Sequence, residues 1–178
     1  MFKDIIANQN FYIYMNKKIG LFLGRFQPFH NGHLLVVEGM TKMCDEIIIG
    51  IGSSNAQNEP DNPFTAEERR DMIQNTLQAK DLIPMFDIRL MDFPDQESDI
   101  EWADHVLESV GDIEKVWTGN ELTKKCFEGK VDIQNIVEVP GISSTEIRAL
   151  MKSGGYWEEK LPNEVVKYLK SIDGTKRV

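Results

Sequence analysis

The sequence predicts an α/β fold in which helices cover both faces of a doubly wound parallel sheet. Short apolar stretches of strand length alternate with helical patterns along almost the whole chain. The stretch 46–51 is apolar almost throughout, which is typical of a strand buried on both faces. Helix-starting signals follow the strands at intervals that suit right-handed crossovers between parallel strands. We therefore expect a Rossmann-like sandwich with extra helices at its C-terminal end.

The first half of the chain is expected to hold three strands and two helices. The spacing of Leu34, Val37 and Met40 indicates the first helix. Thr65 and Glu68 form a capping box that starts the second. The predicted elements are a strand at 19–23, a helix at 33–43, a strand at 46–51, a helix from 65 to about 78 and a strand at 85–90.

The second half continues the alternation and ends in helices. Two more capping boxes are predicted, Ser98 with Glu101 and Ser143 with Glu146. The glycine pair at 154–155 stops the helix that Ser143 starts. The predicted elements are a helix at 98–109, a strand at 115–118, a brief helix after 120, a strand ending at 137–139, a helix at 143–152 and a helix at 162–172.

The length of 178 residues suits one domain, which we place at 17–178. Residues 1–16 are interpreted as an N-terminal appendage. Their apolar run is too short and too interrupted for a signal peptide. The sequence leaves open whether this segment is frayed or packs as an extra strand, and whether Met15 is an alternative start.

The composition argues against nucleic-acid and membrane partners. The formal net charge of −9 argues against DNA or an anionic membrane surface as the main partner. No apolar run approaches the roughly 18–20 residues of a membrane span. The two cysteines, Cys44 and Cys126, fall in helical patterns and are interpreted as core residues. A cytoplasmic protein without nucleic-acid or membrane partners is expected.

The segment Gly24–His33 carries groups that suit a polyphosphate. It joins the first strand to the first helix, where free N–H groups and the helix dipole favour an anion. Arg25, His30 and His33 add side-chain donors at the same place. Metal ligation and simple packing are alternatives for the two histidines. A closed zinc site would need more ligands than the one further histidine, His105, supplies.

A second such segment is Ile142–Arg148. An ordinary helix cap explains Ser143 and Glu146, but three successive hydroxyls and an arginine one turn later suit a second phosphate-binding edge. Trp102 is either a core residue or a flat platform for a heteroaromatic ring. Gly50 and Gly52 lack the third glycine of a dinucleotide fingerprint, so a dehydrogenase is disfavoured.

Together, Gly24–His33 and Ile142–Arg148 resemble the HxGH and ISSTxxR motifs of the nucleotidyltransferase superfamily. From about residue 18 to 172, the chain resembles the archaeal-type nicotinamide-nucleotide adenylyltransferases. The segments that support this branch are Gly50–Ser54, Asn62–Arg69, Trp102 and Gly119–Asn120. The resemblance implies the nucleotidyltransferase α/β-phosphodiesterase type of Rossmann-like fold.

The resemblance also implies roles for matching positions. Those implied to be catalytic are Arg25, His30, His33 and Arg148. Those implied to bind ATP are Gly24, Arg25, Phe26, His30, His33, Gly119, Asn120, Ser143, Ser144, Thr145 and Arg148. Those implied to bind nicotinamide mononucleotide (NMN) are Gly52, Ser53, Ser54, Asp95 and Trp102. No protein metal ligand is expected, and Mg²⁺ would accompany ATP.

The implied reaction is transfer of AMP from ATP to NMN, giving NAD and pyrophosphate. The alternatives are a sibling enzyme acting on phosphopantetheine, FMN or glycerol phosphate, and a catalytically silent nucleotide-binding protein. The family also suggests a homo-oligomer, with a hexamer as one form. Some relatives carry a basic residue where this chain has Asp61, so a phosphate contact from that position is not carried over. The loop 53–61 is likewise divergent.

Overall fold

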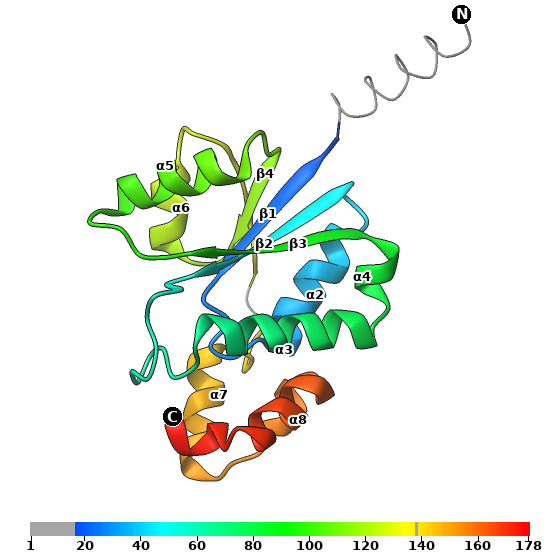
Figure 1. Ribbon diagram of the computed structural model, residues 1–178, viewed down its shortest axis with the longest axis vertical. Helices are drawn as coiled ribbons and strands as arrows, with labels where there is room; N and C mark the ends of the chain where they lie inside the picture. Colours follow the sequence, from blue (N-terminus) through cyan, green and yellow to red (C-terminus); the bar gives the residue numbers. More distant parts are fainter. Residues whose placement is uncertain (1–16, 138) are drawn as a thin grey trace, which may run out of the picture.

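The computed structural model describes residues 17–137 and 139–178. Its centre is a five-stranded parallel sheet with the order β3-β2-β1-β4-β5 (Figure 1). This confirms the predicted doubly wound sheet. The strands are β1 (Ile19–Gly24), β2 (Glu46–Gly52), β3 (Asp87–Phe93), β4 (Lys115–Thr118) and β5 (Asp132–Asn135). The predicted appendage at 1–16 and the alternative start at Met15 lie outside the described residues.

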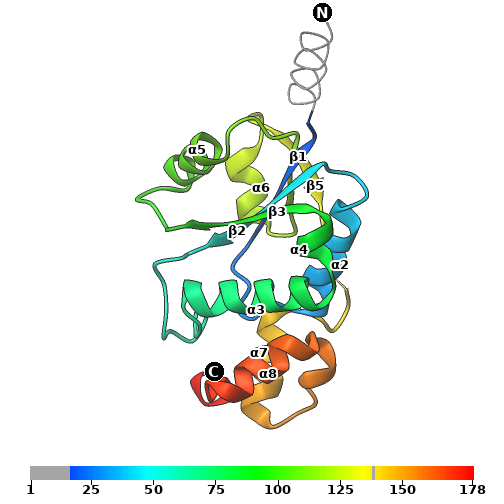
Figure 2. The same cartoon turned by 45° about the vertical axis from the view of Figure 1, so that its right-hand side comes forward.

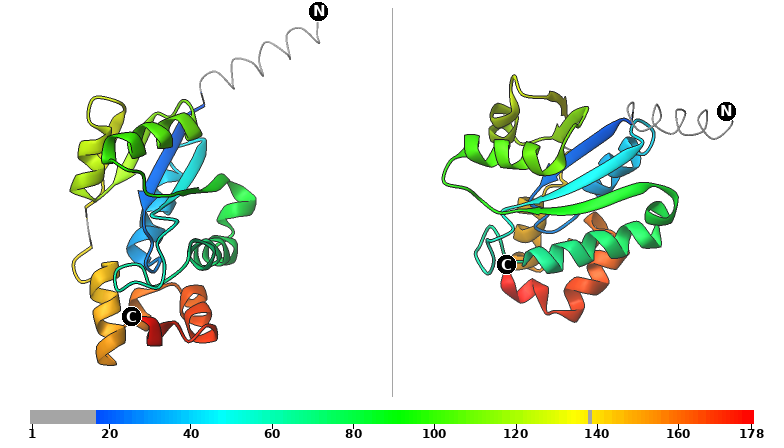
Figure 3. Two further views of the ribbon diagram at one scale, coloured as in Figure 1. Left: turned by 60° about the vertical axis from the view of Figure 1, so that its left-hand side comes forward. Right: turned by 45° about the horizontal axis from the view of Figure 1, so that its top comes forward.

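Helices cover both faces of the sheet, as Figures 2 and 3 show. The helices are α2 (Asn31–Met40), α3 (Ala66–Ala79), α4 (Leu82–Met85), α5 (Asp99–Val110), α6 (Glu121–Phe127), α7 (Ser144–Ser153) and α8 (Asn163–Ser171), with 3-10 turns η1 (Glu158–Lys160) and η2 (Gly174–Arg177). One core lies between the sheet and α2, α3, α7 and α8, and the other lies between the sheet and α5 and α6. Within the described ranges, no helix is long and apolar enough to cross a membrane.

Strand periodicity produces the two cores. In β1, Phe22 faces one core while Leu21 and Leu23 face the other. In β2, Ile47 and Ile49 face the first core and Ile48 faces the second. All these side chains are buried, because side chains of successive strand residues point to opposite faces and helices cover both.

The first helix begins and ends earlier than predicted. It runs over Asn31–Met40 instead of 33–43, because His30 is extended and caps its N-terminus. Thr41 is the C-cap, and residues 41–43 form a turn. Cys44 therefore lies outside the helix, contrary to the prediction, whereas Cys126 lies in α6 and is buried as expected. Burial raises the pKa of the Cys44 thiol to about 11, as expected for a packing residue.

Two strand predictions had wrong bounds. The third strand is Asp87–Phe93 instead of 85–90, since Met85 belongs to the short helix α4. The fifth strand ends at Asn135 and not at Val137–Val139. Its partner β4 ends at Thr118, which pairs with Asn135, so the ladder of β5 with β4 stops there.

The predicted caps exist, with one difference in their geometry. Thr65 and Glu68 make the reciprocal capping box, with both side chains bonded to backbone N–H groups. Ser98 and Ser143 instead act as simple N-caps. In both cases the hydroxyl donates to the carboxylate that was expected to bond the backbone, Glu101 or Glu146. Gly154 ends α7 in the left-handed conformation, as predicted, and Pro162 precedes α8 as its N-cap.

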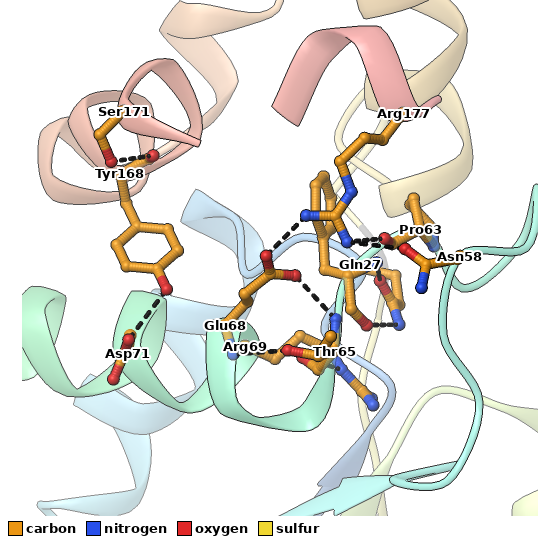
Figure 4. A network of polar contacts seen from close by, with 11 residues as sticks. Gln27, Asn58, Pro63, Thr65, Glu68, Arg69, Asp71, Tyr168, Ser171 and Arg177 are labelled. Atoms are coloured by element: carbon orange, nitrogen blue, oxygen red, sulfur yellow. Dashed lines mark hydrogen bonds and ion pairs between the residues drawn. The ribbon is translucent and has the colours of Figure 1, made fainter. Parts of the chain in front are cut away.

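Contacts from the C-terminal segment hold the start of α3. The Arg177 guanidinium donates to the Glu68 carboxylate at 2.6 Å and to the Pro63 carbonyl at 2.5 Å (Figure 4). About one turn further along α3, Asp71 accepts a hydrogen bond from the Tyr168 hydroxyl of α8 at 2.8 Å. The loop that precedes α3 is therefore fastened by the far end of the chain.

Candidate active site

The two phosphate motifs predicted from the sequence meet in one cavity of about 290 Å³. It lies at the carboxyl ends of β1 and β4, where the strand order reverses. Arg25 and Arg148 both line it. The motifs also contact each other, because the Ser144 hydroxyl donates to the Pro28 carbonyl at 3.1 Å and Arg148 donates to the Gln27 carbonyl at 3.1 Å. The expectation that these two distant segments converge is therefore confirmed.

Every residue predicted to bind ATP lines this first cavity. They are Gly24, Arg25, Phe26, His30, His33, Gly119, Asn120, Ser143, Ser144, Thr145 and Arg148. The N-termini of α2 and α7 both open onto it, so two sets of free backbone N–H groups face the same space. Such a cavity suits an anion, and the ATP contacts themselves stay predictions.

A second cavity of about 430 Å³ adjoins the first. Four of the five residues predicted to bind NMN line it, namely Gly52, Ser53, Asp95 and Trp102. Ser54 is not among the described residues that line it, and its N–H donates to the Phe93 carbonyl instead. The two cavities share Leu23, Gly24, Arg25 and Asn120, so they meet at the end of β1.

His30 and His33 form a capping box of an unusual kind. The His30 Nδ1 accepts from the His33 N–H, and the His33 Nδ1 accepts from the His30 N–H, both at 3.2 Å. Their rings stack with centroids 3.4 Å apart. Because each Nδ1 is an acceptor, the proton of each neutral ring is on Nε2. The histidines thus start the helix and keep one N–H each for a ligand.

Both histidines are neutral at neutral pH. Burial lowers the pKa of His30 from 6.5 to about 4. Burial, together with the neighbouring His30, lowers the pKa of His33 well below 6.5. The His33 ring lies among those of Phe22, Phe26 and Phe29. The pair can therefore donate hydrogen bonds to phosphate without carrying a charge of its own.

The two arginines differ in their surroundings. Arg25 is exposed, and among the described residues its guanidinium makes only a long contact, 3.5 Å, with Asn62. Arg148 is buried, and its guanidinium pairs with the Asp61 carboxylate at 2.8 Å. Burial lowers the pKa of Arg148, and the charge of Asp61 partly offsets this. Asp61, the position that departs from the family pattern, thus contacts a site arginine.

Trp102 is half-buried and faces the second cavity. Its ring meets Phe127 edge-on, with centroids 5.7 Å apart. The indole Nε1 is buried and has no hydrogen-bond partner among the described residues. The residue is therefore both part of the second core and part of the cavity wall, and its role as a platform for a ring stays a prediction.

Two residues that hold the site were missed by the sequence analysis. The Gln27 side chain donates to the Phe64 carbonyl at 2.9 Å and accepts from the Phe64 N–H at 3.0 Å. Arg69 is fully buried and bonds to the ends of β1 and β2. A signal for Arg69 was available: it stands three and four residues before Met72 and Ile73, on the apolar stripe of α3.

A bound metal would find few ligands in the protein itself. In the part of the chain that the structure describes, no group of three or more His, Cys, Asp or Glu side chains could hold an ion. The described residues lining the first cavity include no carboxylate. Hard cations prefer oxygen ligands, and the described lining offers only uncharged ones, the hydroxyl, amide and main-chain oxygens.

Comparisons with known proteins agree with this geometry. The cytidylyltransferase-like family model matches residues 21–150. Nicotinamide-nucleotide adenylyltransferases from Thermococcus kodakarensis and Pyrococcus furiosus are each 38% identical over 164 residues, covering 90% of this chain and 87% of theirs. The enzyme of that name from Thermococcus sibiricus is 40% identical over 162 residues, covering 89% of this chain and 87% of its own.

Solved structures show the same fold. A bifunctional NMN adenylyltransferase/ADP ribose pyrophosphatase from Francisella tularensis, complexed with AMP and a manganese ion, gives a TM-score of 0.74 at 23% identity. The match covers 88% of this chain and 49% of that one, so this chain spans about half the length of the bifunctional protein. The two motifs meet in one cavity, the fold matches, and the relatives are similar over nearly the full length of the chain. The chain therefore belongs to the nicotinamide-nucleotide adenylyltransferases, which are nucleotidyltransferases of the cytidylyltransferase-like family.

Proposed function

We propose that this protein transfers AMP from ATP to the 5′-phosphate of NMN, forming NAD and pyrophosphate, and so acts in NAD biosynthesis. The observation that carries the proposal is the pair of adjoining cavities, which meet at Gly24 and Arg25. One is lined by both phosphate motifs and the other by a tryptophan. The names of the archaeal relatives support the same reaction.

ATP would occupy the first cavity. The cations of Arg25 and Arg148 and the N–H groups of two helix starts balance the charge of a triphosphate. The adenosine would lie against Gly119 and Asn120. Ile136, Val137 and Ile142 give this part of the cavity an apolar wall suited to a purine ring.

Arg148 would exchange one anionic partner for another when ATP binds. Its present partner, the Asp61 carboxylate, is 75% exposed, whereas the Arg148 side chain is 8% exposed. Releasing Asp61 returns a mostly hydrated group to water and costs little. A phosphate with more negative charge then competes well for the same guanidinium.

NMN would occupy the second cavity. The Trp102 ring offers a face for stacking the nicotinamide ring. Ser53 and Asp95, whose side chains are joined by a hydrogen bond of 2.9 Å, stand beside it as polar groups. Because the cavities share Arg25, the acceptor phosphate would lie near the ATP phosphates.

The chemistry requires no enzyme nucleophile. A phosphate monoester has a second pKa of about 6 and is mostly dianionic at neutral pH, so it can attack the α-phosphate directly and in line. Holding the two anions in contact and in line would supply part of the rate enhancement. The Nε2–H groups of His30 and His33 would stabilise charge on the reacting phosphate, and Arg25 and Arg148 would stabilise the leaving pyrophosphate.

A divalent ion would enter with ATP. Mg²⁺ supplies charge neutralisation on phosphate oxygens and needs few protein ligands. The described walls of the first cavity fit this role, since they carry donors and no carboxylate. The Francisella tularensis protein was crystallised with AMP and a manganese ion, which supports the use of a divalent metal here.

An acceptor panel tests the proposed function. The purified protein is given ATP or CTP with Mg²⁺ and one of NMN, nicotinate mononucleotide, phosphopantetheine, FMN or glycerol phosphate, and pyrophosphate release is measured. We expect the highest kcat/KM for ATP with NMN, and NAD as the product. Pyrophosphate release with another acceptor and none with NMN would assign the protein to a sibling activity.

Replacing His33 with Ala should lower kcat by a factor of at least about 100, the scale of losing one transition-state donor. The variant also loses half of the capping box, so about 1 kcal/mol of stability should go with it. Steady-state kinetics and thermal unfolding measure the two effects. A folded variant with near-normal kcat would remove His33 from the chemistry.

Replacing Trp102 with Ala should raise the KM for NMN by roughly tenfold, because stacking on an aromatic ring contributes about 1–3 kcal/mol. The KM for ATP should change little, since Trp102 does not line the first cavity. Trp102→Phe keeps a ring at the site and serves as the matched control. Equal KM values for NMN in the wild type and the Ala variant would place the nicotinamide elsewhere.

The neutral state of His30 predicts a pH effect on stability. Its pKa is about 4 in the folded protein and 6.5 when unfolded, so the unfolded chain binds an extra proton between these values. The free energy of unfolding should therefore fall as pH drops from 6.5 to 4, by about 3 kcal/mol from this group. His30→Asn keeps an N-cap acceptor and should lose that part of the slope in urea denaturation. Identical slopes would mean that His30 takes up its proton over the same pH range in the folded and the unfolded chain.

A further inference from the structure

Arg69 occupies a position where an apolar residue would be expected. Its side chain has no exposed surface, and it follows the same helical stripe as Met72, Ile73 and Thr76, which are also fully buried. Burying a guanidinium is costly unless its donors are satisfied. A residue that packs at such a cost is a candidate for a role beyond filling the core.

Within the described part of the chain, all hydrogen bonds of the Arg69 side chain go to main-chain carbonyls. Its Nε donates to Thr65 in its own helix at 3.1 Å. Its Nη1 donates to Arg25 at the end of β1, at 2.9 Å, and to Gly52 at the end of β2, at 2.8 Å. Its Nη2 donates to the carbonyl of Ser53 at 3.0 Å. One side chain thus joins the turns that follow two neighbouring strands.

The next residue, Arg70, shows a different pattern. It pairs with the Asp92 carboxylate at 2.7 Å and donates to the carbonyl of Leu90 in β3. It lines neither cavity. In Figure 4, Arg69 extends away from Arg177, while Glu68 of the same turn reaches toward it. Glu68, Arg69 and Arg70 therefore contact three different parts of the molecule: the C-terminal segment, the ends of β1 and β2, and β3.

The two carbonyls that share the Arg69 Nη1 precede residues in a rare backbone conformation. Phe26 follows Arg25 and has φ 53°, and Ser53 follows Gly52 and has φ 47°. Residues other than glycine seldom adopt this left-handed region and are held there by surrounding contacts. In a trans peptide the C=O and N–H point in opposite directions, so anchoring these carbonyls aims the N–H groups of Phe26 and Ser53 away from Arg69.

The anchored residues are those that line the cavities. Arg25 lines both, Phe26 lines the first and Ser53 lines the second. Burial lowers the pKa of Arg69 only to about 10, so the guanidinium stays protonated and keeps all its donors at neutral pH. We propose that Arg69 is a positioning residue that locks the turns after β1 and β2 to each other, and so sets the distance between the two bound substrates. This inference rests on the proposed two-substrate function.

Four variants of the full-length protein test it: Arg69→Lys, Arg69→Met, Arg70→Lys and Arg70→Met. Kinetics with ATP and NMN are measured well below each melting temperature. Arg69→Met should lower kcat/KM for NMN by about 100-fold, the scale of a 1 Å misplacement in a reacting pair. Arg69→Lys should lower it by roughly tenfold, because an ammonium is a point donor and cannot span the same carbonyls. Both Arg70 variants should stay within about threefold of the wild type, as expected for a part-exposed ion pair.

Two readouts separate positioning from a purely structural role. Loss of stability alone would lower the melting temperature and the folded fraction but leave the KM for NMN unchanged. We expect that KM to rise by roughly tenfold in Arg69→Lys, since the Ser53 turn borders the second cavity. The amide signals of Phe26 and Ser53 in nitrogen-15 spectra should shift in Arg69→Lys and not in Arg70→Lys.

Each outcome decides the question. If the wild type and the Arg70 variants do not make NAD, the proposed function fails. The amide spectra then still test whether Arg69 holds the turns after β1 and β2 together. If the wild type is active and a folded Arg69→Lys keeps its kcat, its KM for NMN and its amide signals, the inference is overturned. If neither Arg69 variant folds while both Arg70 variants do, Arg69 serves folding alone, and the inference is overturned as well.

Discussion

The structure depends on one constraint: in a parallel sheet, all strands end at the same edge. With the order β3-β2-β1-β4-β5, β1 lies between β2 and β4. The register pairs Gly24 with Ile51, so the ends of these strands are level. The crossover from β3 to β4 leaves a crevice beside β1, and ligands of such sheets bind there. Arg25 and Arg148, 123 positions apart in the sequence, reach one cavity for this reason.

Polar side chains at this edge bond mainly to the backbone of the site. Gln27 binds both main-chain groups of Phe64, and the two histidines bind each other's N–H groups. The Arg148 guanidinium donates to the Gln27 carbonyl, and Arg148 also lines the cavity. Donors held in place in this way need little reorganisation when a charged ligand arrives, which is the main source of electrostatic catalysis. The same contacts satisfy groups that would otherwise be costly to bury.

Much of the fold could be predicted because its signals are local. Alternating apolar runs predicted all five strands, although the bounds of the third and the end of the fifth were misplaced, and Thr65, Ser98 and Ser143 marked helix starts correctly. The errors lie where a contact with another part of the chain sets the end of an element. The end of β5 depends on where β4 stops, and the start of α2 depends on a histidine acting as a cap. Ser54 was expected at the NMN site from the family resemblance; the structure places its N–H against the Phe93 carbonyl, and its role stays a prediction.

The sequence alone determined the order of the elements, the two phosphate motifs and most of the residues around them, because periodicity and spacing record local geometry. Tertiary structure decided the protonation and the hydrogen-bond partners of those residues. His33 is neutral because it is buried beside three phenylalanines, and burial likewise keeps His30 neutral. The pairing of Asp61 with Arg148 joins segments far apart in the chain, and so do the bonds from Arg69 to the carbonyls of Arg25, Gly52 and Ser53. Burial and long-range partners exist only after the chain has folded, so no local pattern could contain them.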